Sequence, residues 1–104
     1  MAQSLIWSQE ALDDIDNIAE YIGRDSIYHA QQVVEQIFEL GDSLTNQPEL
    51  GRVVPELNNP LIRERFIYSY RLIYEINVFG VHIMAVIHGK RLLDAIQGRF
   101  EVNS

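Results

Sequence analysis

The second half of the chain carries side chains that could bind phosphate and transfer protons. These candidates are Arg63, Arg65, Arg71, His88, Lys90 and Arg91. Arg63 and Arg65 are two residues apart, so in a strand both would point to one face. In a metal-independent ribonuclease, arginine and lysine stabilise the charge that develops on phosphate, while histidine, glutamate or tyrosine moves protons. His88 with Glu64 or Glu75, or with the nearby tyrosines, would supply these residue types.

The same residues also have a simpler, structural interpretation, which the residue pattern alone favours. Arg63, Arg65 and Glu75 would form cross-strand charge pairs on a solvated face, as opposite charges on neighbouring strands commonly do. Three tyrosines recur in the stretch YSYRLIYEI, and such alternation first indicates a strand whose tyrosines pack the core. Both interpretations depend on the register near Ser69, because a slip of one residue would move Arg71 to the other face.

The sequence offers little to hold a metal or an organic cofactor. It has no cysteine and three histidines. His82 and His88 lie six residues apart, which in a strand corresponds to about 20 Å. The glycines are not grouped as in a phosphate-binding loop, and no Gly-x-Ser-x-Gly motif occurs. We therefore expect no metal and no cofactor.

Charge is distributed unequally between the two halves. Residues 1–50 contain ten acidic residues and one basic residue, whereas residues 51–104 contain five acidic and seven basic residues. The halves therefore carry −9 and +2, and the chain carries −7. Proteins that bind nucleic acid through bulk charge usually present a basic face, so the total charge argues against that class. A local basic site in the second half stays open.

Length and composition predict one domain spanning residues 1–104. A chain of 104 residues with 47% hydrophobic content can bury one core but not two. No apolar run approaches the roughly 18 residues of a membrane span, and the N-terminus lacks the features of a signal peptide. We expect a cytoplasmic protein with no membrane partner.

The hydrophobic pattern of the first half predicts a strand followed by two helices. The short apolar lead SLIW precedes Ser8, which is placed to cap a helix that ends near Gly23. Asp25 or Ser26 can cap a second helix, whose apolar positions recur as far as Leu44. The short link between them makes the helices an antiparallel hairpin.

The second half predicts a β-meander after a loop that contains three prolines. Strands are expected at about 61–68, 70–77 and 81–88, and a short C-terminal helix at about 91–97. The fold class is therefore α+β, with the helix hairpin packed on one face of a mainly antiparallel sheet. The other face of the sheet would be left available for function.

Four motifs in this order are similar to those of a known superfamily. They are WSQEALDDIDNIAEYI, PELGRVVPEL, IRERFIYSYRLIYEI and AVIHGKR. Together they resemble the RelE/ParE superfamily of type II toxin–antitoxin toxins, most closely its ParE-like branch, over about residues 4 to 92. Arg71 matches the arginine of the superfamily's YR(I/L)xY strand, and residues 88–91 match a ParE-like HGxR ending.

The resemblance implies a small toxin that is neutralised by a cognate antitoxin. The toxin would form either a hetero-oligomer with its antitoxin or a homodimer. ParE-like members are thought to poison DNA gyrase without a ribonuclease site, which would make the six candidate residues target contacts. RelE-like members are ribosome-dependent endoribonucleases that cleave mRNA, and here His88 would transfer protons while Arg65 and Arg71 hold phosphate. A third alternative is a non-toxic remnant that acts as a binding module. The acidic charge and the single lysine favour the gyrase poison.

Overall fold

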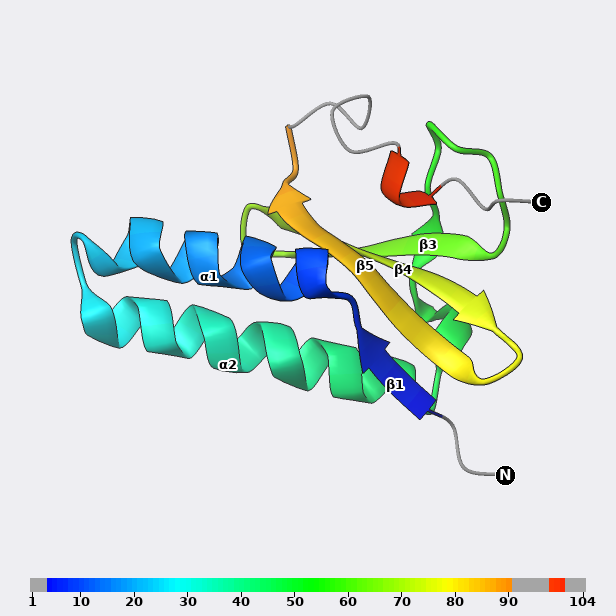
Figure 1. Cartoon of the computed structure of the whole chain (residues 1–104), viewed down its shortest axis with the longest axis horizontal. Helices are drawn as coiled ribbons and strands as arrows, with labels where there is room; N and C mark the ends of the chain where they lie inside the picture. The colour runs from blue at the N-terminus through cyan, green and yellow to red at the C-terminus, as the bar shows by residue number, and fades with distance from the viewer. Residues whose placement is uncertain (1–3, 91–97, 101–104) are drawn as a thin grey trace.

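The computed structural model describes residues 4–90 and 98–100, and within them it has the predicted α+β architecture (Figure 1). In chain order the elements are β1 (Ser4–Trp7), α1 (Gln9–Gly23), α2 (Ile27–Leu44), the 3-10 helix η1 (Pro48–Leu50), β2 (Arg52–Val53), β3 (Ile62–Ile67), β4 (Tyr70–Asn77) and β5 (Gly80–His88). The helix expected at 91–97 lies outside the described residues. In the described part of the chain, no helix is long and apolar enough to cross a membrane.

Each of the two helices begins at a serine whose side chain caps it. The Ser8 hydroxyl accepts a hydrogen bond from the backbone N–H of Ala11 at 3.0 Å, and the Ser26 hydroxyl accepts one from the N–H of His29 at 3.1 Å. These bonds satisfy N–H groups that have no partner within the helix. These bonds confirm Ser8 and Ser26 as the N-caps. The predicted end of α1 at Gly23 is confirmed as well.

The five strands form one sheet in the order β1-β5-β4-β3-β2. The meander β3-β4-β5 is antiparallel, as predicted, and β1 joins its edge parallel to β5. Gly80 allows this contact: its φ is +136°, and a Cβ there would lie 2.2 Å from the carbonyl oxygen of Ser4. A bulge between Ile73 and Tyr74 shifts the register of β4 against β5.

The main core lies between the helix hairpin and one face of the sheet. Figure 1 shows the hairpin beside the sheet. Ile15 of α1 and Ile37 of α2 pack there against Leu72, Tyr74 and other buried strand residues. The three-and-four spacing of apolar residues on the helices supplies one side of this core. The strands supply the other side.

The opposite face of the sheet is partly covered, which corrects the expectation that it would be open. Val54, from the loop after β2, and Phe100 pack against Ile73, Ile87 and other residues of that face. Val54 is fully buried, and Phe100 is buried as well. The strands therefore bury apolar side chains on both faces, which explains why β5 is apolar at nearly every position.

Candidate functional site

Arg71 lies at the centre of an ionic cluster on the sheet face opposite the helices. Its Nε donates to Glu64 Oε1 at 2.8 Å, and its Nη1 and Nη2 donate to the two carboxylate oxygens of Glu56 at 2.9 and 3.0 Å. The Arg71 side chain is 5% exposed and that of Glu64 is fully buried. Glu56 comes from the loop between β2 and β3 and remains half exposed. Each nitrogen of the Arg71 guanidinium thus has a carboxylate partner.

A second arginine completes this cluster. Arg52 Nε donates to the other Glu64 oxygen at 2.6 Å, and the Arg52 guanidinium lies 5.3 Å from the centre of the Phe66 ring. Glu64 therefore accepts from two arginines, which compensates the cost of burying its charge. Glu64 and Phe66 lie two residues apart on β3 and therefore point to the same face. Their cross-strand partners, Arg52 on β2 and Arg71 on β4, point to that face as well.

The protonation equilibria follow from this geometry. The hydrogen bond from Arg71 lowers the pKa of Glu56 below its ordinary value. Burial disfavours the charged form of Arg71, but the hydrogen bonds to Glu56 and Glu64 outweigh burial and raise the pKa of Arg71. The contact between Arg71 and Glu56 therefore favours the charged form of both side chains, in a cluster of two arginines and two carboxylates.

The cations predicted from the sequence do not converge on one surface. Arg65 pairs with Leu72 and Arg63 with Tyr74, so both lie on the helix-side face, whereas Arg71 lies on the opposite face and is buried. Arg63 donates to the carbonyl oxygens of Pro60 and Gly51, each at 3.1 Å. The register of β3 and β4 therefore separates Arg71 from Arg63 and Arg65, and the three arginines do not form the single contact surface that the sequence suggested.

The expected cross-strand pairs of Arg63, Arg65 and Glu75 are also absent from the ion pairs of residues 4–90 and 98–100. The cross-strand partner of Glu75 on β3 is Ile62, not an arginine. The pairs form instead between Glu64 and the arginines of neighbouring strands.

His88 and Lys90 lie at the exposed end of β5. The Nδ1 of His88 accepts from the Lys90 backbone N–H at 3.2 Å, and its ring meets Tyr70 edge to face with 6.1 Å between ring centres. Arg65 shares the helix-side face with Tyr70. The predicted contact Arg91 lies outside the described residues. Within the described part of the chain, no three histidine, aspartate or glutamate side chains are grouped to hold a metal.

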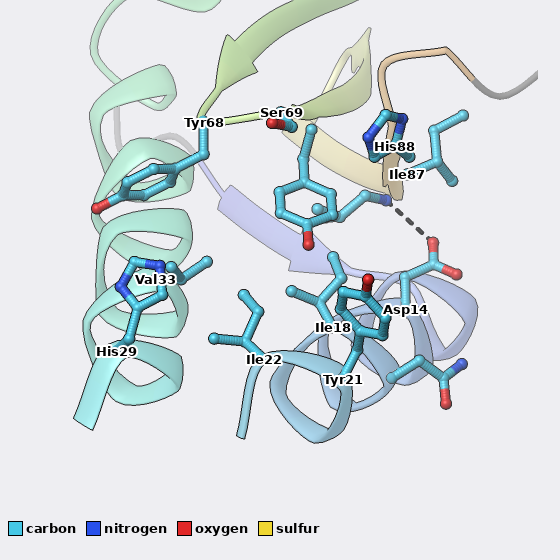
Figure 2. A pocket seen from close by; sticks show the side chains of 13 residues that line it. Asp14, Ile18, Tyr21, Ile22, His29, Val33, Tyr68, Ser69, Ile87 and His88 are labelled. Atoms are coloured by element: carbon cyan, nitrogen blue, oxygen red, sulfur yellow. Dashed lines mark hydrogen bonds between the residues drawn. The ribbon is translucent and has the colours of Figure 1, made fainter. Parts of the chain in front are cut away.

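A groove of about 580 Å³ opens beside His88, between the helix hairpin and the ends of β4 and β5 (Figure 2). Aromatic and imidazole side chains line its walls. Tyr21 belongs to α1, His29 to α2, and Tyr68 to the turn between β3 and β4. Ile18, Ile22 and Val33 form part of its lining (Figure 2).

Tyr68 and Tyr70 each contribute a ring to the lining of this groove. Tyr68 has a φ of +52°, a conformation that is unusual for a bulky residue, and its ring meets His29 edge to face at 6.3 Å. Burial, with a smaller contribution from Tyr21, raises the pKa of Tyr70. The groove is therefore lined by apolar and aromatic side chains that several elements bring together.

Asp14 anchors the floor of the groove and joins three parts of the chain. Its Oδ2 accepts from the backbone N–H of Val86 at 3.0 Å, the bond drawn in Figure 2. The Arg99 guanidinium donates to both carboxylate oxygens of Asp14, at 2.6 and 3.1 Å. These bonds raise the pKa of Arg99. Asp14 thus fixes α1 to β5 and to the segment at 98–100.

Sequence reasoning missed the groove and the carboxylate partners of Arg71. Tyr21, His29 and Tyr68 come from three elements, and no motif connects them. Glu64 was singled out for proton transfer, but its fully buried pairing with Arg71 depends on the register. The alternation of Glu64 with Arg63 and Arg65 was the available signal, since it places Glu64 on the other face.

Comparisons with known proteins agree with this architecture. Residues 5–93 match the model of the family described as ParE toxin of type II toxin-antitoxin system, parDE. The chain is 33% identical over 92 residues to Toxin RelE2 of Caulobacter vibrioides, covering 88% of this chain and all of that protein. A solved structure described as a chromosomal ParDE TA system from P. aeruginosa superposes with a TM-score of 0.70 at 20% identity, covering 84% of this chain and 96% of that one. The chain belongs to the ParE toxin family of type II toxin–antitoxin systems.

Proposed function

We propose that this toxin inhibits DNA gyrase in the cytoplasm and does not cleave RNA. The observation that carries the proposal is that Arg71 is buried and paired with carboxylates. A ribonuclease needs cationic side chains aimed at the phosphate that reacts. The Arg71 guanidinium instead donates hydrogen bonds to Glu56 and Glu64, and the Arg71 side chain is 5% exposed.

The remaining candidates support the same conclusion. His88 lies on β5 near the groove, with Arg71 buried on the opposite face of the sheet. A general acid or base must come within about 3 Å of the proton that it transfers, and the phosphate ligand must lie beside it. Within the described residues, no hydrogen bond or ion pair joins His88 to an arginine. The net charge of −7 further disfavours docking on ribosomal RNA.

The surface that contacts gyrase would be the exposed cationic end of the helix-side face. Arg65 and Lys90 are exposed there, and His88 lies beside the groove. None of these three side chains has a carboxylate partner in the described ion pairs. They are therefore available to a partner.

The cognate antitoxin would occupy the groove next to this end. An amphipathic helix that lays apolar side chains in a groove is a recurring mode of peptide recognition. The groove offers Ile18, Ile22 and Val33 to such a helix, and Tyr21 and Tyr68 flank it. A segment bound there would lie beside His88, so antitoxin and target would compete for one region.

Gyrase assays with purified components test the target. The toxin should trap gyrase in a complex that releases cleaved plasmid DNA on detergent treatment, and the double variant Arg65→Ala, Lys90→Ala should lose most of this activity. A matched control is Arg24→Ala, since Arg24 is an exposed cation at the end of α1 whose ion-pair partner among the described residues is Glu20. Cleavage of mRNA on translating ribosomes, with gyrase unaffected, would overturn the proposal in favour of the RelE-like alternative.

A separate growth assay tests the groove. Tyr21→Ala should leave the toxin active but reduce rescue by the co-expressed antitoxin, since Tyr21 contributes to the groove and is 68% exposed. Tyr28→Ala is the control, because Tyr28 is 70% exposed on the neighbouring helix and does not line the groove. Equal rescue of both variants would place the antitoxin elsewhere.

A further inference from the structure

The outer edge of β1 is a second surface that the toxin family does not explain. β1 ends the sheet, and among the described residues no strand pairs with its outer side (Figure 1). The N–H groups of Ser4 and Ser8 donate toward β5, to Phe79 at 2.8 Å and Ile83 at 2.9 Å. Because backbone groups alternate along a strand, the N–H and C=O groups of Leu5 and Trp7 point away from the sheet.

This edge lacks the usual features that prevent strands from pairing. The strand reads SLIW and contains no charge and no proline. Ile6, at its centre, is 50% exposed. The adjoining turn between β4 and β5 adds Val78 and Phe79, which are 93% and 69% exposed. An apolar surface therefore borders a row of open backbone donors and acceptors.

The strand is also held rigidly, so its edge is ready to pair. The Trp7 ring packs on Phe38 with 4.7 Å between ring centres and lies against Gly41 of α2. Leu5 packs against the main core as well. These contacts fix the backbone of β1 before any partner arrives, which lowers the ordering entropy lost on association.

We propose that β1 pairs antiparallel with β1 of a second copy of this chain, about a two-fold axis at Ile6. In this register Leu5 of each copy faces Trp7 of the other. The outward N–H and C=O groups of both residues then form four hydrogen bonds, and the two Ile6 side chains meet as a non-hydrogen-bonded pair.

The strand itself argues for a second copy as the occupant. A two-fold contact requires a surface that is complementary to itself, and an uncharged strand meets its copy without repulsion although the chain carries −7. A charged partner strand would gain no ion pair along this edge. The two five-stranded sheets would become continuous. This inference is independent of the gyrase proposal.

Sedimentation equilibrium of the free toxin, made by cell-free synthesis, tests the dimer. The wild type should sediment at twice the mass of one chain across the micromolar range. Ile6→Lys should raise the dimer dissociation constant by about tenfold or more, because like charges would face each other across the axis. Ile27→Lys, at another exposed isoleucine of 71% exposure on α2, should leave it unchanged. A monomeric wild type, or a dimer that persists in Ile6→Lys, would overturn the inference.

Oxidative crosslinking tests the register, because the chain has no cysteine of its own. Ile6→Cys should form a disulfide-linked dimer, since a non-hydrogen-bonded antiparallel pair brings the two Cα atoms to about 4.5 Å, within disulfide range. Ile27→Cys should crosslink at the slow rate of random collision. Equal rates for the two variants would contradict a two-fold axis at Ile6.

Discussion

Arg71 and Glu64 form a buried ion pair in which Nε of the arginine donates to Oε1 of the glutamate at 2.8 Å. The two residues come from adjacent strands, and neither side chain is more than 5% exposed. The pair holds the Arg71 guanidinium away from solvent, and this burial supports our proposal that the toxin does not cleave RNA. The pair also makes strong predictions about stability.

Removing either partner should destabilise the fold severely. Glu64→Ala leaves Arg71 buried with only the half-exposed Glu56 as a partner, and loss of one member of a buried pair typically costs about 3–5 kcal/mol. Arg65→Ala, an exposed arginine on the same strand, should change the free energy of unfolding by no more than about 0.5 kcal/mol. Urea denaturation measures both values. A Glu64→Ala loss below about 1 kcal/mol would show that the pair is solvated in solution.

The Glu56–Arg71 contact should make stability depend on pH in the acid range. The hydrogen bond from Arg71 lowers the pKa of Glu56 from its ordinary value of 4.5. Its contribution is therefore fully present above that value and is lost as the pH falls through the lowered folded value. The stability difference between wild type and Glu56→Gln should be constant near neutrality and shrink below about pH 4.5. A difference that grows on acidification would have the wrong sign.

Gly80 should be essential for docking β1 onto the sheet. Gly80→Ala would place a Cβ 2.2 Å from the Ser4 carbonyl oxygen, in a backbone with φ of +136° that L residues rarely adopt. We expect a loss of at least about 1–3 kcal/mol, together with a shift in the fluorescence of the single tryptophan, Trp7. Gly98→Ala is the control, because a Cβ there meets no atom within 4 Å. Equal stability of the two variants would contradict the β1–β5 contact.

Asp14 should contribute more to stability than its acidic neighbours on α1. Asp14→Ala removes the acceptor of the Val86 N–H and leaves Arg99 without its carboxylate. An unsatisfied buried donor costs about 1–3 kcal/mol. Asp16→Ala, at an exposed position of the same helix, should be nearly neutral. Thermal unfolding of the two variants gives the comparison, and similar melting temperatures would exclude an anchoring role for Asp14.

Local sequence patterns determined much of the fold but little of the site. The capping serines and the apolar spacing specify α1 and α2, and the β-branched and aromatic runs specify the meander. These signals are local and follow from helix and strand periodicity. β2, η1 and the bulge at Ile73 depend on tertiary contacts, and no periodic signal indicates them.

The placement of Arg71 shows why the site was harder to predict. Its face is set by the two-residue turn at Tyr68 and Ser69, where one residue more or less would reverse it. Its second partner, Glu56, comes from a loop whose path is determined by long-range packing of Val54. A residue type that matched a phosphate ligand was therefore insufficient to assign that role.

Pulse labelling after induction tests the central claim most directly. The toxin would be expressed without antitoxin, and the incorporation of labelled thymidine and methionine would be followed over the first minutes. Inhibition of gyrase predicts that DNA synthesis falls first while protein synthesis continues, and that the double variant Arg65→Ala, Lys90→Ala delays this fall. An immediate fall in methionine incorporation, with DNA synthesis affected only later, would contradict the account and indicate mRNA cleavage.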